Sequence, residues 1–326
     1  MIKSKLLNAF TLIIILSLTG CFSGQSNAAQ GGGQPAESLP VAPAVPAESL
    51  PEEPPGAPEP DNDWQRDLPE NHSMDSGVLA ALHAALDDAP IYAAVTVKDG
   101  YIVDEYFKEG YDGNSVFSLQ SCTKSFTGAL VGVAIDQGYI ESVDVPLAQY
   151  FPELQERDNP YWGEITIRHL LTHSSGINDA NFMDWYRSEN WIDYTLNQGI
   201  AGKPGTVFIY STGGSHLLSA VIQQAVGMSE YEYGRRNLFE PLGMDSVRWR
   251  TDPQGFTDGG NGIEMNVYDM AKFGQLFLGG GQWRGRQIIS GDSTWSRFSP
   301  ATSRTTQAGR SPISPITYWR LVNKPV

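Results

Sequence analysis

The sequence predicts an α/β chain of the α+β type, in which an antiparallel sheet is flanked by helices and joined to a mostly helical subdomain. Residues 76–86 carry apolar side chains at helical spacing, and two β-rich runs follow at 91–97 and 101–107. Residues 98–100, Lys-Asp-Gly, are typical of the tight turn of an antiparallel hairpin. A helix, a hairpin and a second helix in this order do not match the βαβ series of a nucleotide-binding sheet.

The second helix lies within residues 115–138 and has an unusual charge distribution. Residues 126–135 are apolar or small on every side, which is typical of a buried helix. Lys124 stands at the start of this segment and is the only formal charge between Asp112 and Asp136. Because a buried ammonium is costly unless a partner or a lowered pKa compensates, Lys124 is a candidate functional residue.

Ser121 precedes Lys124 by three residues, so on a helix the two side chains share a face. In the first turn of a helix, free backbone N–H groups and the helix dipole favour developing negative charge. A hydroxyl, a neighbouring amine and a helix N-terminus are the parts of an activated serine nucleophile. Ser-x-x-Lys is a short motif, however, and the alternative is a capped helix whose lysine extends to solvent.

The composition allows a large folded core and is acidic. The chain has 326 residues, a hydrophobic content of 40% and a formal net charge of -15. Seven of the negative charges lie between residues 22 and 63, a stretch without Lys or Arg. Binding to nucleic acid is disfavoured, because neutralising phosphates requires clustered Lys and Arg.

Residues 1–20 are expected to be a signal peptide of the bacterial lipoprotein type. Two lysines precede a short apolar stretch around 12–16, which is too short for an ordinary transmembrane span. The ending Leu-Thr-Gly-Cys at 18–21 resembles a lipobox, which implies cleavage before Cys21 and lipid attachment to its thiol. The alternative is an ordinary signal peptide with an incidental cysteine. We expect a protein anchored by lipid to a membrane of the bacterial cell envelope, on the extracytoplasmic side.

Residues 21–63 are expected to form a flexible tether that leads to a folded domain at 64–326. The tether is rich in Gly, Ala, Pro and Glu, and it contains Pro-Ala-Glu-Ser-Leu-Pro at 35–40 and again at 46–51. The only other cysteine is Cys122, so lipidation of the first one leaves no pair for a disulfide within the chain.

His169 and His173 lie four residues apart in a region, 139–255, that is predicted to be mostly helix and loop. This spacing would place two imidazoles on one helix face, where they could bind a metal. No glutamate stands between them in the HExxH manner, and no third ligand is evident. We therefore expect capping and loop hydrogen bonds here, and neither a metal nor another cofactor.

Tyr210 stands among small residues just before a further helix, which would let its side chain project into a cavity. A hydrogen-bonded core tyrosine is the alternative. The remaining expected elements are helices at 215–226 and 267–278, a glycine loop at 259–262, a short hairpin within 279–289 and a strand at 316–322.

Together these segments resemble the serine β-lactamase-related family, in particular its branch of class C β-lactamases, D-alanyl-D-alanine carboxypeptidases, esterases and 6-aminohexanoate-dimer hydrolases. The matching segments occur in the family's order and extend over about residues 75 to 322. They are Ser121-Cys122-Thr123-Lys124, the run HLLTHSSG at 169–176, Tyr210-Ser211, FEPLGM at 239–244, and the glycine loop 259–262 with DMAK at 269–272.

The resemblance implies a β-lactamase/penicillin-binding-protein-like fold and a serine hydrolase that cleaves an ester or amide, with β-lactams and D-amino peptides among the possible substrates. It implies Ser121 as nucleophile, Lys124 as the residue that holds its proton network, and Tyr210 as general base, with an acyl-Ser121 intermediate. The backbone N–H of Ser121 would be one half of the oxyanion hole. Thr212 and Asn261 would line the substrate site.

The sequence departs from the family pattern at two points. Thr212 stands where the tyrosine motif usually ends in Asn, which argues against β-lactam-type recognition because a hydroxyl has a shorter reach than an amide. The family's Lys- or His-x-Gly strand does not follow Val322, so we expect the C-terminal strands to be missing. We expect the sequence to be a fragment of a longer product, with a truncated and inactive protein as the alternative. The alternative from another class is a non-catalytic envelope lipoprotein that binds cell-wall peptides.

Overall fold

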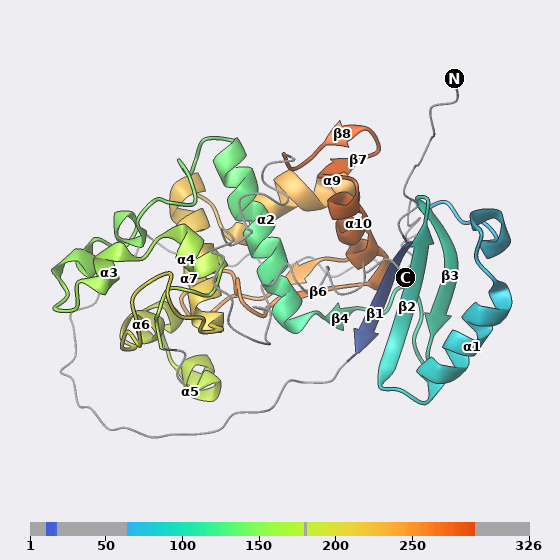
Figure 1. Cartoon of the computed structure of the whole chain (residues 1–326), viewed down its shortest axis with the longest axis horizontal. Helices are drawn as coiled ribbons and strands as arrows, with labels where there is room; N and C mark the ends of the chain where they lie inside the picture. The colour runs from blue at the N-terminus through green and yellow to red at the C-terminus, as the bar shows by residue number, and fades with distance from the viewer. Residues whose placement is uncertain (1–10, 18–63, 179–180, 291–326) are drawn as a thin grey trace.

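The computed structural model describes residues 11–17, 64–178 and 181–290. A three-stranded antiparallel sheet lies at one end of the molecule, and a mostly helical part lies at the other (Figure 1). The predicted α+β class is confirmed. None of the helices in the described part of the chain is long and apolar enough to cross a lipid bilayer.

The main sheet has the strand order β1-β2-β3, with antiparallel neighbours formed by Thr11–Ser17, Ile91–Lys98 and Tyr101–Phe107. The β2–β3 hairpin turns at Asp99 and Gly100, whose φ angles of 54° and 87° both lie in the left-handed region. Two successive positive φ angles give a turn whose twist suits antiparallel strands, which explains the Asp-Gly pair.

The side chains of β2 alternate between the two faces of this sheet. Two helices cover those faces, α1 (Ser76–Asp87) and α10 (Val267–Leu278), and they lie on opposite sides of the strands in Figure 1. Ala94 forms a small cluster with Tyr106 of β3 and Leu86 of α1. Val95 and Val97 belong to the main core instead, which extends into the helical part.

β1 lies within the segment that is expected to be a signal peptide. Its backbone pairs with β2 from Thr11 opposite Lys98 to Leu16 opposite Ala93. Its sequence, Thr-Leu-Ile-Ile-Ile-Leu-Ser, is rich in β-branched residues that favour strands. The apolar residues that suggest a leader therefore also suit an edge strand. The predicted cleavage point and tether fall on residues 18–63, outside the described part of the chain, and stay predictions.

The helical part is built around α2 (Thr123–Asp136) and α7 (Thr212–Val226), which pack against each other. The other helices are α3 (Tyr161–Glu164), α4 (Ile167–Leu171), α5 (Phe182–Arg187), α6 (Trp191–Leu196), α8 (Glu230–Gly234) and α9 (Glu240–Leu242). Short helical turns are η1 (Pro69–His72), η2 (Gln120–Cys122), η3 (Leu147–Gln149), η4 (Pro152–Glu156) and η5 (Arg235–Phe239).

Two further small sheets are separate from the main sheet. One has the strand order β4-β6-β5, formed by Phe117–Ser118, Ile263–Met265 and Arg248–Trp249. The other is the hairpin of β7 (Gln282–Trp283) and β8 (Arg286–Gln287), which follows α10 as predicted. The strand predicted at 316–322 lies outside the described residues.

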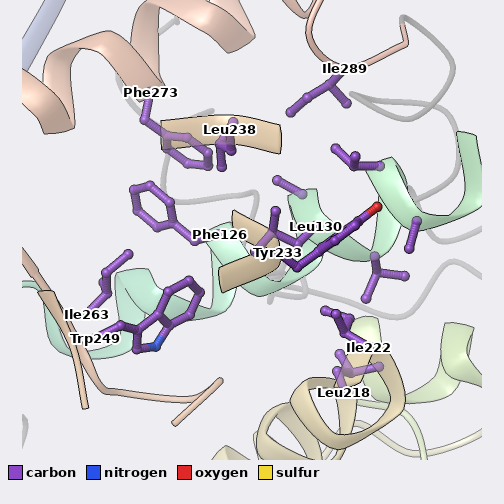
Figure 2. Packing of buried hydrophobic residues seen from close by; sticks show 14 of the residues in the cluster. Phe126, Leu130, Leu218, Ile222, Tyr233, Leu238, Trp249, Ile263, Phe273 and Ile289 are labelled. Carbon is purple, nitrogen blue, oxygen red and sulfur yellow. The ribbon is translucent and has the colours of Figure 1, made fainter. Parts of the chain in front are cut away.

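The core surrounds α2 on every side, as its sequence predicts. Eleven of the 14 residues of α2 are buried. Phe126 stacks on Phe273 of α10 with ring centroids 3.8 Å apart. Figure 2 shows Leu218 and Ile222 of α7 on the opposite side of α2 from Phe273. Because α2 is held by α7 and α10 together, its N-terminal end has a fixed position.

Candidate active site

Ser121 and Lys124 meet at the N-terminal end of α2. Ser121 lies in η2, the short turn that leads into α2, and not in the first turn of the α-helix itself. Ser121 is exposed, whereas Lys124 is buried, with only 5% of its surface accessible. Lys124 Nζ donates a hydrogen bond to Ser121 Oγ over 3.3 Å. The exposed hydroxyl of Ser121 is thus hydrogen-bonded to a buried amine.

Three further contacts surround the amine of Lys124. Nζ donates hydrogen bonds to the Gly260 carbonyl at 2.7 Å and to Thr212 Oγ1 at 3.3 Å. It also lies 4.9 Å from the centre of the Tyr210 ring. A carbonyl, a hydroxyl and an aromatic face all attract a cation, so together they compensate for the loss of water around the buried lysine.

The start of α7 positions Tyr210 and Thr212. Ser211 has an extended backbone, and its Oγ accepts a hydrogen bond from the Gly214 N–H at 2.8 Å, so it caps the helix. The helix begins at Thr212, three residues earlier than predicted, because of this cap. Thr212 is buried, whereas Tyr210 is 40% exposed. The cap therefore fixes the positions of the buried Thr212 hydroxyl and the partly exposed Tyr210 ring, both of which lie near Lys124 Nζ.

The sequence did not predict a role for His173 at the site. In the structure its ring packs against the ring of Tyr210. The two ring centroids are 4.5 Å apart. His173 Nδ1 accepts a hydrogen bond from the Ser211 N–H at 3.2 Å. Burial, and to a smaller extent the charge of Lys124, lowers the pKa of His173 to about 3, so its imidazole is neutral at neutral pH.

His169 has a different environment from His173. Its Nδ1 accepts a hydrogen bond from the Thr166 N–H at 3.1 Å as part of the capping box that begins α4. The two histidines therefore make the capping and loop hydrogen bonds expected of them and do not converge. Within residues 64–178 and 181–290, no three His, Cys, Asp or Glu side chains group in a way that could hold a metal ion.

A buried aspartate holds the glycine loop that presents the Gly260 carbonyl. Asp258 Oδ1 accepts hydrogen bonds from the N–H groups of Gly260 at 3.1 Å and Asn261 at 3.0 Å. Its Oδ2 lies 3.0 Å from Arg250 Nη2. A Cβ at position 260 would lie only 2.6 Å from Thr212 Cγ2, so this close approach requires glycine.

Asn261 is connected to the Ser121 turn through Gln120. Asn261 Nδ2 donates a hydrogen bond to Gln120 Oε1 at 3.0 Å. Gln120 directly precedes Ser121 and has a φ of 48°, a left-handed conformation that is uncommon for residues other than glycine. No motif in the sequence distinguishes Gln120 as a site residue. Its role depends on a contact with a residue 141 positions later, which no local pattern indicates.

Glu230 lies behind the glycine loop and is completely buried. Burial raises its pKa to about 8; the hydroxyls of Ser219 and Thr127 oppose this shift, and the nearby charge of Asp258 adds to it. The carboxyl group is therefore protonated at neutral pH. Thr127 Oγ1 also donates a hydrogen bond to the Gly259 carbonyl at 2.8 Å, so Glu230 and the loop share a neighbour.

The raised pKa of Glu230 predicts a pH dependence of stability. Unfolded, its carboxyl ionises near 4.5, whereas folded it keeps its proton up to about pH 8. Between these values the folded state binds more protons, so the free energy of unfolding falls as pH rises. Between pH 5 and pH 7 the free energy of unfolding of the wild type should therefore fall by roughly 2 kcal/mol because of Glu230, and we expect this fall to be absent from Glu230→Gln. Urea unfolding at several pH values measures it, with exposed Glu141→Gln as control. A Glu230→Gln protein with the wild-type slope would contradict the assignment.

The structure brings four of the predicted residues together around one nitrogen atom, Lys124 Nζ. They are Ser121, Lys124, Tyr210 and Thr212. Asn261 is linked to this group through Gln120. The predicted lipid-attachment residue, Cys21, lies outside the described residues. A hydroxyl, an amine and a phenol gathered at a partly exposed position are the groups that serine-based acyl transfer requires.

Comparisons with known proteins identify the family of the chain. Residues 80–319 match the protein-family model described as Beta-lactamase. The chain is 34% identical over 152 residues to penicillin-binding protein 4* of Bacillus subtilis (strain 168), a match that covers 41% of this chain and 31% of that protein. It is 24% identical over 230 residues to the 6-aminohexanoate-dimer hydrolase of Paenarthrobacter ureafaciens, covering 65% of this chain and 58% of the relative.

A solved structure supports the fold. The octameric penicillin-binding protein homologue from Pyrococcus abyssi superposes with a TM-score of 0.54 at 24% identity, covering 68% of this chain and 59% of that one. The matches span less than two thirds of the length of each of these three proteins.

Proposed function

The chain belongs to the beta-lactamase family, and from this premise we propose that it is a hydrolase that cleaves an ester or amide through an acyl-Ser121 intermediate. One observation carries this proposal. The buried amine of Lys124 lies 3.3 Å from the exposed Ser121 hydroxyl and 4.9 Å from the centre of the Tyr210 ring. A buried lysine with these neighbours can relay the proton that a serine must lose before it attacks a carbonyl.

The proposed reaction has two halves. As Ser121 Oγ bonds to the carbonyl carbon, its proton passes to Tyr210 and Lys124, and they return it to the departing alcohol or amine when that bond breaks. A water molecule then attacks the acyl carbon, loses a proton to the same pair, and Ser121 regains its hydrogen as the acid leaves. The proposed oxyanion donor at Ser121 is its own backbone N–H.

We favour linear esters or amides over β-lactams as substrates. Thr212 occupies the position where the serine β-lactamase-related family usually has Asn. Its Oγ1 already accepts a hydrogen bond from Lys124 Nζ at 3.3 Å. A hydroxyl used in this way has less capacity to bind a substrate amide than a carboxamide would. The names of two relatives, a 6-aminohexanoate-dimer hydrolase and lovastatin esterase from Penicillium rubens, support amide and ester substrates.

We further propose that the enzyme acts in the cell envelope. The Leu-Thr-Gly-Cys sequence at 18–21 supports lipidation of Cys21, and the Pro- and Ala-rich residues 21–63 support a spacer between the membrane and the hydrolase domain. The partner in that location is a small or peptidic ester or amide, and nucleic acid is disfavoured by the acidic charge.

Covalent labelling tests the proposal directly. The full chain is treated with a fluorophosphonate probe or a fluorescent penicillin and digested with trypsin, and the adduct is located by fragmentation within residues 109–124. That peptide also contains Ser115 and Ser118, which serve as internal controls. We expect the adduct on Ser121. An adduct elsewhere would remove Ser121 from the mechanism, and a folded chain that forms no adduct would favour the non-catalytic binding protein.

A further inference from the structure

We propose that His173 is a positioning residue that holds Tyr210 in place for proton transfer at Ser121, an inference that rests on the proposed function. Three contacts of one residue carry it. Two of them are hydrogen bonds to the backbone on either side of Tyr210, and the third is a contact with its ring.

His173 is hydrogen-bonded to both chain neighbours of Tyr210. Its carbonyl accepts a hydrogen bond from the Ile209 N–H at 2.8 Å, and its Nδ1 accepts one from the Ser211 N–H at 3.2 Å. One residue thus fixes the backbone immediately before and immediately after the tyrosine. Because Ser211 also caps α7, the side-chain bond links Tyr210 to the helix that carries Thr212.

The ring of His173 packs against the ring of Tyr210. Their centroids are 4.5 Å apart and their planes are tilted by 39°. His173 is only 2% exposed, whereas Tyr210 is 40% exposed. A rigid buried ring beneath a partly exposed one restricts its rotation, so that the phenol stays near Lys124 Nζ, which lies 4.9 Å from the ring centre. Proton transfer between positioned groups is sensitive to displacements of about 1 Å.

The hydrogen-bond pattern also assigns the tautomer of His173. A neutral imidazole that accepts a bond at Nδ1 carries its hydrogen on Nε2. Nε2 is buried and has no hydrogen-bond partner among the described residues. Protonation of Nδ1 would convert the acceptor of the Ser211 N–H into a donor and would break this link. The same burial lowers the pKa of His173 to about 3, which keeps Nδ1 an acceptor.

The backbone of His173 indicates the best conservative replacement. Its φ is 54°, in the left-handed region that asparagine tolerates better than most residues. An asparagine amide oxygen can also accept a hydrogen bond from a backbone N–H. His173→Asn therefore keeps an acceptor and the backbone conformation, whereas His173→Ala removes the acceptor and the ring.

Labelling kinetics of the full chain test this role. We expect His173→Ala to lower the maximal rate of phosphonylation of Ser121 by about 10- to 100-fold, with the probe's half-saturating concentration within about twofold of wild type. His173→Asn should recover most of that rate. His169→Ala is the matched control: it removes a histidine that caps α4, so it should lower the melting temperature and leave the rate within about twofold.

Three outcomes would overturn the inference. The first is that the folded His173→Ala chain labels at the wild-type rate. The second is that the labelling rate of His169→Ala falls as much as that of His173→Ala. The third is that the folded His173→Asn chain labels no faster than His173→Ala. Measuring the tautomer of His173 tests the inference independently of labelling. In a long-range proton–nitrogen NMR spectrum, His173 should carry its hydrogen on Nε2, and His173→Ala should shift the Ser211 amide signal. A hydrogen on Nδ1 would overturn the inference, whereas a wild-type chain that never labels would count against the proposed function alone.

Discussion

Replacing Ser121 with alanine is expected to abolish covalent labelling and to lower turnover of an ester or amide substrate by about 10³-fold or more. The reason is that the substitution removes the only atom that forms the proposed acyl bond. The Ser121 side chain is exposed and makes its described contact with Lys124 Nζ alone, so the variant should fold normally. Labelling, steady-state turnover and the melting temperature are measured on the same preparation.

Ser125→Ala is the matched control for this prediction. Ser125 lies in α2, directly after Lys124 and four residues after Ser121, and is half-buried. It should keep both labelling and turnover within about twofold of wild type. Unchanged labelling of the Ser121→Ala chain would show that another residue reacts, and the proposed mechanism would then be wrong.

Replacing Asp252 with alanine is expected to lower the free energy of unfolding by about 3–5 kcal/mol. Asp252 and His216 of α7 form a pair whose side chains are both 0% exposed, with Oδ2 and Nε2 2.9 Å apart. Asp252 Oδ1 also accepts hydrogen bonds from the N–H groups of Gln254 and Phe256, each at 2.8 Å. The substitution leaves the fully buried His216 without its partner and removes the acceptor of two half-buried backbone N–H groups.

Urea unfolding followed by tryptophan fluorescence measures this loss. The ring of Trp191 is 5.3 Å from that of His216, so its emission should report on the same region. Asp245→Ala, at an exposed carboxylate, serves as control and should change the unfolding free energy by less than about 0.5 kcal/mol. A loss below about 1 kcal/mol for Asp252→Ala would mean that the surrounding structure relaxes around the unpaired histidine.

The parts of the fold that depend on local pattern could be predicted from the sequence. The β2–β3 hairpin follows from two β-rich runs on either side of Asp99-Gly100, and α2 follows from its continuous apolar surface. α10 has the predicted bounds, 267–278. The bounds of α7 were less accurate, because Ser211 acts as an N-cap ahead of two glycines that the periodicity alone does not include in a helix.

The candidate site was predictable only where its residues belong to a motif. Ser121 and Lys124 are three residues apart, so their contact is almost a local property. The hydrogen bonds of Asn261 to Gln120 and of His173 to the Tyr210 segment are not local, because they depend on how separate segments pack. The sequence shows His173 as one of two histidines four residues apart, and nothing in that spacing distinguishes the one that contacts Tyr210.

The bond between Lys124 and the Gly260 carbonyl has a consequence for how this site can change by mutation. The acceptor is a main-chain oxygen, so no single amino-acid exchange at position 260 deletes it, in contrast to a carboxylate partner that one exchange can remove. Selection can act on this anchor only by moving the loop, through the steric limit that Thr212 sets on a Cβ at position 260 or through loss of the Asp258 hydrogen bonds. The carbonyl partner of the lysine cannot be deleted by substitution, but it can be displaced by a side chain at position 260, by loss of Asp258, or by an insertion or deletion within 258–262.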